Sequence, residues 1–269
     1  SLRYMGSKWQ LSKWITAKFP PHARYVEPFC GSASVFFRKE PSEIEVLNDL
    51  NGDLVNFFRV LRNNSEELVN LIELTPFAHE EYLLSWEPCA DPIESARRFY
   101  VRSWQSFSAD TKTRSGWRRI SSSSRDRTAI KDWRRLDGLR QAVLMLRRAQ
   151  IDNLDAVDCM ERNDTPETLF YVDPPYVHST RKSLRTNHQY RWEMTDDDHY
   201  ALAECLHRLK GMVIVSGYDS PLYQELYKDW YVCIKSNTTN GNSVATEYLW
   251  LSPNATRPGN LPLFRKVNN

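Results

Sequence analysis

Short apolar runs rich in β-branched or aromatic residues alternate with helical patterns along the chain, and this alternation restricts the fold more than any other feature. Runs of the type expected for strands cover residues 24–27, 44–47, 169–172, 212–215, 230–234 and 247–251. Between the later runs, Thr195 is a good N-cap residue for one helix, and Pro221 is a good first-turn residue for another. Strands that alternate with helices predict an α/β fold with a largely parallel sheet, whose functional loops lie at the carboxyl ends of the strands.

Residues 53–148 interrupt this alternation of strands and helices. They have the patterns of helices and of a basic loop; residues 136–148, for example, place apolar side chains on one side of a helix. A chain of 269 residues is long enough for a sizeable hydrophobic core but shorter than two ordinary domains. We therefore expect one α/β domain made of residues 1–60 and 149–269, with residues 61–148 inserted as a mostly helical lobe.

The formal net charge of +2 conceals a strongly basic segment. Residues 97–148 contain fifteen Lys or Arg and four Asp, so this segment carries a charge of +11 and the rest of the chain −9. Aromatic residues interleave with these charges, among them Trp104, Phe107, Trp117 and Trp133. Because arginine forks match phosphate oxygens and guanine edges, this composition favours polyanion binding; a solvated basic face on a helical insertion is the alternative. A second basic run, between His178 and Trp192, contains no acidic residue.

Composition also argues against several classes of protein. The longest aliphatic run is Met212 to Val215, far short of the roughly 20 apolar residues of a membrane-spanning helix. The polar residues 1–10 lack the apolar stretch of a signal peptide. The five cysteines are scattered, and no C-x-x-C pair suggests a disulfide framework or a zinc knuckle. We expect a soluble cytoplasmic protein with reduced thiols and no metal.

The tetrapeptide Asp-Pro-Pro-Tyr at residues 173–176 follows a predicted strand directly. Each proline fixes φ and removes a backbone donor, so Asp173 and Pro174 offer rigid hydrogen-bond acceptors only. An Asp173 oxygen and the Pro174 carbonyl can each accept a hydrogen from an exocyclic amino group, while the Tyr176 ring covers a flat base. Two fixed acceptors would localise the lone pair of such an amine and stabilise the positive charge that it gains on attacking a methyl donor. The plainer alternative is a proline turn after a strand.

Two other motifs precede this tetrapeptide: Leu-Arg-Tyr-Met-Gly-Ser-Lys at residues 2–8 and Arg-Tyr-Val-Glu-Pro-Phe-Cys-Gly-Ser at residues 24–32. Together the three motifs resemble those of the Dam-like (D12 class) DNA adenine-N6 methyltransferases, which use S-adenosylmethionine, and the likeness covers most of the chain. The resemblance implies a Rossmann-like methyltransferase sheet with an inserted DNA-recognition lobe. It also implies site-specific methylation of a flipped adenine in double-stranded DNA. The implied catalytic residues are Asp173, Pro174 and Tyr176.

The resemblance also implies a set of residues that bind the methyl donor: Tyr4, Lys8, Glu27, Phe29, Gly31, Asp49, Asp155 and Asp173. Lys8 would pair with the carboxylate of the donor, Asp49 with its ribose hydroxyls, and Asp155 with its adenine amino group. Without the resemblance, Lys8 fits an exposed helix start, and Asp49 and Asp155 fit helix caps. Ser32 and Ala33 depart from the glycine-richer pattern of the family, although small residues still allow close approach.

An adenine inside a duplex must swing out of the stack before its amino group can be methylated, at a cost of a few kcal/mol. The two basic segments would supply this energy by holding phosphates and reading base edges. The residues expected to contact DNA are Arg114, Arg118, Arg119, Arg125, Arg127, Arg181, Lys182 and Arg185.

Three rival functions stay open at this point. A related Pro-Pro-Tyr clamp would also serve an RNA methyltransferase or a protein-glutamine methyltransferase. A catalytically inactive DNA-binding module would share the basic segments. A dehydrogenase or another nucleotide-binding enzyme is disfavoured because the chain lacks a G-x-G-x-x-G fingerprint. The sequence also leaves open the recognised DNA site, the oligomeric state and a cognate restriction endonuclease as a partner.

Overall fold

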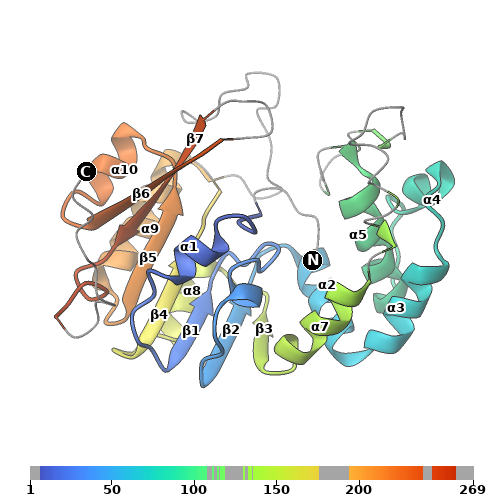
Figure 1. The fold of residues 1–269 in the computed structure, drawn as a ribbon, viewed down its shortest axis with the longest axis horizontal. Coiled ribbons are helices and arrows are strands. Elements are labelled where there is room, and N and C mark those ends of the chain that lie inside the picture. Colours follow the sequence, from blue (N-terminus) through green and yellow to red (C-terminus); the bar gives the residue numbers. More distant parts are fainter. Residues whose placement is uncertain are drawn as a thin grey trace.

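The computed structural model describes residues 7–107, 111, 114, 116–118, 130, 133, 134, 136–175, 194–238 and 244–258 (Figure 1). Within these residues, seven strands form one sheet in the order β3-β2-β1-β4-β5-β7-β6. Strands β1 to β5 pair in parallel, whereas β7 pairs antiparallel with both β5 and β6. The strands are β1 Arg24–Glu27, β2 Ile44–Asn48, β3 Ala149–Asp152, β4 Thr168–Val172, β5 Met212–Gly217, β6 Tyr231–Thr238 and β7 Val244–Leu251. The predicted α/β fold with a mostly parallel sheet is therefore confirmed.

All six predicted strand segments lie at observed strands, and the differences concern strand ends and one missed strand. β6 and β7 are eight residues each, longer than predicted, because they pair with each other along their whole length. The prediction missed β3, whose four residues Ala-Gln-Ile-Asp contain only two apolar side chains and follow a helix almost directly. That helix, α7, spans Asp137–Leu146, so the predicted helical stretch 136–148 runs past its end.

The strands alternate their side chains between two hydrophobic clusters, one on each face of the sheet. In β1, for example, Tyr25 belongs to one cluster and Val26 to the other. The Val26 cluster includes residues of three helices: α8 (Ala156–Arg162), α9 (Asp196–Arg208) and α10 (Pro221–Leu226). The Tyr25 cluster includes residues of α1 (Ser12–Thr16) and of the 3₁₀ helix η1 (Phe36–Arg38). The buried sheet thus provides a rigid base for the loops at the strand ends.

The helix starts predicted in the C-terminal half are confirmed. The Thr195 side chain accepts a hydrogen bond from the backbone of Asp198, and the Asp198 side chain accepts one from the backbone of Thr195, which forms a capping box at the start of α9. Ser220 caps α10 by accepting from the Tyr223 backbone, and Pro221 occupies the first turn.

Between β2 and β3 the described chain forms five helices: α2 Gly52–Asn63, α3 Ser65–Leu74, α4 His79–Leu84, α5 Pro92–Gln105 and α7. They lie beyond the β3 edge of the sheet (Figure 1). Stacked and tilted aromatic rings join α2 to α5, with Phe57 against Phe99 and Tyr100. The expected boundary between residues 60 and 61 falls inside α2, and the division of the chain into two domains stays a prediction.

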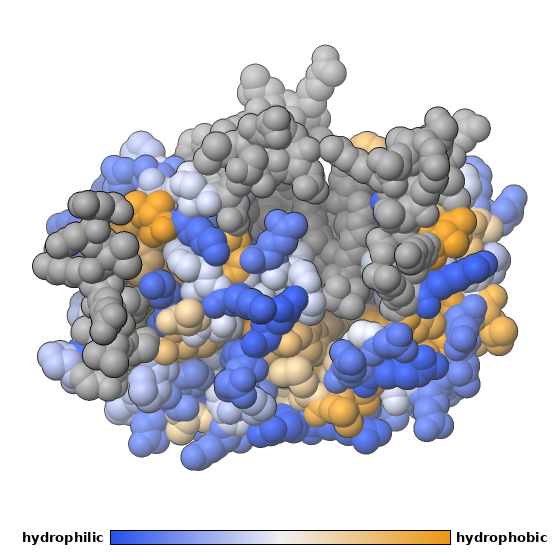
Figure 2. All heavy atoms as spheres, viewed as in Figure 1, coloured by the Kyte–Doolittle hydropathy of each residue, from blue (hydrophilic) through white to orange (hydrophobic). Residues whose placement is uncertain are grey.

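The described surface in the view of Figure 2 is mainly hydrophilic, and its hydrophobic side chains form separate patches. Among the described residues, no helix is both long enough and apolar enough to cross a membrane.

Candidate active site

A cavity of about 480 Å³ opens at the carboxyl ends of the parallel strands. Its walls come from the segments that follow β1, β2, β3 and β4, together with residues 7 and 8 and the start of α9. In open parallel sheets this edge is where ligands bind, because the loops from neighbouring strands diverge there. Eight of the ten residues predicted for catalysis or donor binding line the cavity: Lys8, Glu27, Phe29, Gly31, Asp49, Asp155, Asp173 and Pro174. The other two, Tyr4 and Tyr176, lie outside the described residues.

The loop after β1 approaches the cavity through backbone in the left-handed region. Gly31 has φ of 47°, a conformation that glycine adopts without steric cost. Ala33 has φ of 50°, which is unusual for a residue with a side chain, and its side chain is fully buried. This is one of the positions where the family pattern favours glycine. This chain therefore makes the left-handed turn with an alanine.

Asp49 holds this loop to the end of β2. Its Oδ2 accepts a hydrogen bond from the Gly31 backbone at 2.9 Å, and its Oδ1 accepts one from the Asn51 backbone at 2.9 Å. Burial raises the pKa of Asp49, and the two backbone donors oppose this rise by stabilising the carboxylate. Each carboxylate oxygen has a further lone pair for a ligand hydroxyl. The acid is therefore already oriented toward the cavity.

Glu27 ends β1 as a buried carboxyl group in the wall of the cavity. Its Oε1 accepts hydrogen bonds from the Tyr25 hydroxyl at 2.6 Å and from the Phe36 backbone at 2.8 Å. Burial raises the pKa of Glu27 to about 8, although both hydrogen bonds favour the ionised form. At neutral pH Glu27 is mostly protonated and can donate a hydrogen bond as well as accept one.

Asp173 directly follows β4 and also lines the cavity, with 18% of its side chain exposed. Its Oδ1 lies 3.2 Å from the Lys8 ammonium, and the same ammonium lies 2.9 Å from Oε1 of Glu247. Burial raises the pKa of Asp173 to about 6, and the positive charge of Lys8 limits this rise. Above pH 7 Asp173 is therefore ionised and can accept a hydrogen bond.

Asp155 begins α8, where its Oδ1 accepts a hydrogen bond from the Val157 backbone at 2.8 Å. The helix-cap interpretation of Asp155 is thus confirmed, and the residue lines the cavity as well. Asn48 joins the same loops, because its side chain donates to the Pro28 and Leu154 carbonyls and accepts from the Leu154 backbone. Sequence reasoning assigned Asn48 no role, since its partners are far from it along the chain.

Most of the chain matches one known protein family. The family model described as D12 class N6 adenine-specific DNA methyltransferase matches residues 4–240. The chain belongs to this family. It is an N6 adenine-specific DNA methyltransferase, and membership implies S-adenosylmethionine as the methyl donor.

Named relatives of this methyltransferase agree with the family. The Type II methyltransferase M1.LlaDCHI of Lactococcus lactis subsp. cremoris is 25% identical over 262 residues, which cover 89% of this chain and 88% of that protein. The DNA adenine methylase of Salmonella typhi is 25% identical over 241 residues, 84% of this chain and 83% of the relative. The DNA N-6-adenine-methyltransferase of Escherichia phage P1 is 33% identical over 69 residues, 26% of this chain and 9% of that protein.

Two of the residues expected to contact DNA are described. Arg114 is exposed, and Arg118 is half-buried, with its backbone donating to the Gln105 carbonyl at 2.7 Å. The neighbouring Trp117 donates from Nε1 to the Gln105 side chain at 3.1 Å, so this part of the basic segment is anchored to the end of α5. The remaining six lie outside the described residues: Arg119, Arg125, Arg127, Arg181, Lys182 and Arg185.

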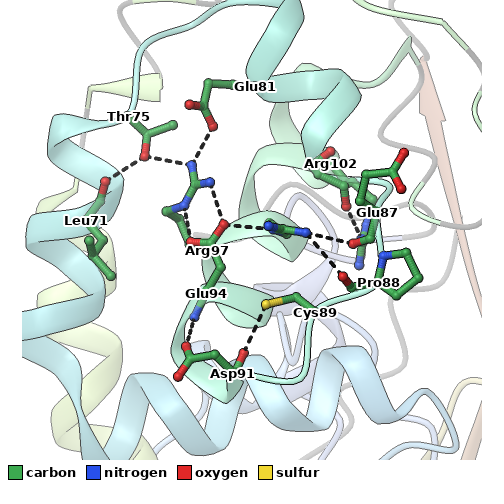
Figure 3. Close-up of polar contacts among 12 residues, drawn as sticks. Leu71, Thr75, Glu81, Glu87, Pro88, Cys89, Asp91, Glu94, Arg97 and Arg102 are labelled. Carbon is green, nitrogen blue, oxygen red and sulfur yellow. Dashed lines mark hydrogen bonds and ion pairs between the residues drawn. The ribbon is translucent and has the colours of Figure 1, made fainter.

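Three arginines of the basic segment of the methyltransferase pair with acidic residues inside the helical region: Arg97, Arg98 and Arg102. Arg97 binds Glu81 and Glu94, each at 2.7 Å, and also contacts Thr75 (Figure 3). Hydrogen bonds from Arg97 and Arg98 lower the pKa of Glu94 to about 2. Arg102 reaches the Ser85 carbonyl and Asp53. These three charges hold α2, α4 and α5 together, so the segment presents fewer free cations than its composition suggests.

Within the described ranges, no group of three His, Cys, Asp or Glu side chains is arranged to hold a metal ion. The five cysteines are free thiols, and four of them are buried.

Proposed function

We propose that this methyltransferase binds S-adenosylmethionine in the cavity at the carboxyl ends of β1 to β4 and methylates N6 of an adenine that is flipped out of double-stranded DNA. The observation that carries the proposal is the position of Asp173: one carboxylate is at once part of the Asp-Pro-Pro-Tyr motif and part of the cavity wall. A donor in the cavity and an amine held by this motif would therefore meet at the same carboxylate.

The lining of the cavity supports binding of this donor. Asp49 lies after β2, where an acid reaches the ribose hydroxyls in nucleotide-binding α/β folds. The apolar side chains of Phe29 and Leu154 suit the faces of a flat base, and Asp155 can accept from its amino group. The carboxylate of Asp173 suits a positively charged sulfonium. Tyr4, Lys8, Glu27 and Gly31 complete the set of donor-binding residues proposed from the family resemblance.

In the proposed reaction, Asp173, Pro174 and Tyr176 act on the target adenine. The ionised Asp173 and the Pro174 carbonyl accept the two N6 hydrogens, which turns the nitrogen lone pair toward the cavity, while the Tyr176 ring stacks on the base. Bound S-adenosylmethionine would supply an electrophilic methyl group on a sulfonium and would leave as the neutral thioether S-adenosylhomocysteine, while N6 would give up its surplus proton to Asp173 or to water. The acceptors remain in contact with N6 as it gains positive charge, so their interaction strengthens toward the transition state.

The basic segments support duplex DNA as the substrate. Extraction of a paired adenine costs a few kcal/mol, which contacts to phosphates on both sides of the base can offset. We assign these contacts to the residues already predicted: Arg114, Arg118, Arg119, Arg125, Arg127, Arg181, Lys182 and Arg185. Residues 61–148 would form the DNA-recognition lobe, and residues 1–60 with 149–269 the catalytic domain.

A restriction endonuclease that cuts the same DNA site is the proposed partner, because a relative over most of the chain is named a Type II methyltransferase. The enzyme would then act on DNA in the cytoplasm and protect the site from its partner.

The proposal is tested by methyl transfer from labelled donor to duplex DNA, single-stranded DNA, RNA and protein, assayed in parallel. We expect N6-methyladenine in duplex DNA at one short sequence, which sequencing of DNA from expressing cells would identify. Transfer to RNA or to protein alone would overturn the proposed substrate. Binding of DNA without donor binding or turnover would instead indicate an inactive DNA-binding module.

A further inference from the structure

A second buried acid lies behind the cavity wall. Glu247 is on β7 and is 4% exposed, and its Oε1 lies 2.9 Å from the Lys8 ammonium. The same oxygen accepts a hydrogen bond from the Ser216 hydroxyl of β5 at 2.6 Å. Burial of a charged carboxylate is costly unless it is paired and hydrogen-bonded, as this one is. Its position in the middle of a sheet strand therefore calls for an explanation beyond packing.

Lys8 connects this acid to the proposed catalytic acid. Its ammonium is 2.9 Å from Glu247 and 3.2 Å from Asp173, so one cation is shared between two carboxylates. Lys8 and Asp173 line the cavity, whereas Glu247 is not part of its lining. Glu247 can act on the reaction through Lys8 or through its own electric field.

We propose that Glu247 is a positioning residue for methyl transfer, which holds Lys8 so that the ammonium neutralises Asp173 only in part. The inference rests on the proposed role of Asp173. With both acids ionised, the three groups carry a net charge of −1. During the reaction, positive charge moves from the donor sulfur to the adenine nitrogen that Asp173 holds, and a net negative site stabilises this charge more strongly at the nitrogen than at the sulfur. If Lys8 paired with Asp173 alone, the pair would be neutral and the ammonium would compete for the oxygens that must accept from the adenine.

Other ionisable groups near Asp173 do not supply this charge. Glu27 of β1 is mostly protonated at neutral pH because its pKa is about 8. Tyr171 of β4, Tyr218 after β5 and Tyr223 of α10 also interact with Asp173, but burial raises the pKa of all three phenols. These three phenols therefore stay neutral over the pH range of an assay.

The residue opposite Glu247 across the β6–β7 pair is Lys235. Its ammonium lies over the ring of Trp14, 5.8 Å from the centroid. The direct cationic contact to Glu247 within hydrogen-bond distance is that of Lys8.

The test is a pH profile of the single-turnover methylation rate for Glu247→Gln. Glutamine keeps an oxygen for the Ser216 hydroxyl and removes the charge. We expect the rate at pH 7 and saturating donor to fall about tenfold, a barrier change of about 1.4 kcal/mol. The acidic limb of the profile should also move to lower pH, because the negative charge of Glu247 contributes to the raised pKa of Asp173. A merely structural residue would lower the rate without moving this limb.

Glu45→Gln is the matched control. Lys39 and Glu45 form another buried ion pair, at 2.6 Å, away from the cavity lining. Loss of this pair should lower the thermal stability and leave the acidic limb in place. A wild-type rate in Glu247→Gln, or a reduced rate with an unmoved limb, would overturn the inference.

Two more variants keep the outcomes separable. If the wild type transfers no methyl group to duplex DNA, the proposed function fails. If Asp173→Ala remains active, the proposed role of Asp173 fails and this inference with it. If Asp173→Ala is inactive and Glu247→Gln behaves as wild type, only the present inference fails. Should Glu247→Gln not fold, Glu247→Asp tests the same idea, because it keeps the charge and draws it away from Lys8. We expect a lower rate with the limb in place, and an unchanged rate would contradict the inference.

Discussion

The backbone amide of Gly31 donates to Oδ2 of Asp49 at 2.9 Å, which joins the loop after β1 to the end of β2. Through this hydrogen bond the proposed ribose-binding acid also fixes the glycine turn of the proposed donor cavity. We expect Asp49→Asn to raise the dissociation constant for S-adenosylmethionine at least about tenfold, since hydrogen bonds to a charged group contribute about 1.5–3 kcal/mol. Isothermal titration calorimetry measures this constant.

Asp49→Ala should weaken donor binding further than Asp49→Asn, because alanine also leaves the amides of Gly31 and Asn51 without their acceptor. Thermal unfolding of each variant separates a local effect from loss of the fold. Donor affinity equal to that of the wild type in both variants would remove Asp49 from the donor site.

Asp173→Ala should abolish most turnover, by about a hundredfold or more, and leave DNA binding nearly intact. The carboxylate is an acceptor for the reacting amine in the proposed mechanism, whereas the phosphate contacts lie elsewhere. In the wild type, the methylation rate should fall as the pH drops through about 6, because Asp173 then becomes protonated and loses its charge. Single-turnover assays between pH 5 and 8 measure both effects. Substantial activity of Asp173→Ala would contradict the acceptor role.

Local sequence was enough to predict six of the seven described strands and the loop of Asp173, because the information is contained in a few consecutive residues. The run 169–172 is uniformly apolar, and the prolines that follow end the strand. The place of Asp49 in the cavity lining could be predicted for a similar reason, since its spacing along the sequence from the glycine loop is typical of nucleotide-binding folds. Both residues line one cavity because the parallel strands that precede them end at the same edge of the sheet.

Pairing between distant residues could not be predicted in this way. Lys8 and Glu247 come from opposite ends of the chain, and only the insertion of β7 beside β5 brings them together. Charge counting was misleading for Arg97 for two reasons. Glu81 lies on another helix, α4, and Glu94, three residues earlier on α5, falls just outside the counted segment 97–148. A count of charges along a sequence does not separate paired ions from exposed ones.

Glu27→Gln should make the thermal stability less dependent on pH. The pKa of Glu27 is about 8 in the folded protein and near 4.5 in an unfolded chain, so the folded state binds more protons between these values. The stabilising contribution of the proton is complete below about pH 4.5 and is lost as the pH rises through about 8. The Tm of the wild type should therefore fall more steeply than that of the variant between pH 5 and 8. Calorimetry at four pH values checks this, and parallel slopes would contradict it.

Arg97→Ala should destabilise the helical region. The side chain is 9% exposed and joins Thr75, Glu81 and Glu94, so its loss takes the arginine from Glu81 and leaves Glu94 with Arg98 alone. Hydrogen bonds of this charged type contribute about 1.5–3 kcal/mol, and we expect the Tm to fall by several degrees. The salt dependence of DNA binding should stay as in the wild type, because Arg97 is occupied inside the protein. A flatter salt dependence with an unchanged Tm would instead assign Arg97 to the DNA contacts.

Neutralising Arg118 and Arg119 should weaken duplex binding and make it less dependent on salt. Each phosphate contact releases counterions, so the slope of log K against log salt should fall by about one for each contact that is lost. Arg208→Ala is the control for the single variants Arg118→Ala and Arg119→Ala, because this arginine is exposed on α9, pairs with Glu204 and, like each of them, contributes one positive charge. Fluorescence anisotropy with a labelled duplex at several salt concentrations gives the slopes. The same slope for the double variant, Arg208→Ala and the wild type would mean that Arg118 and Arg119 belong to a solvated basic surface, and that the DNA is held by other residues.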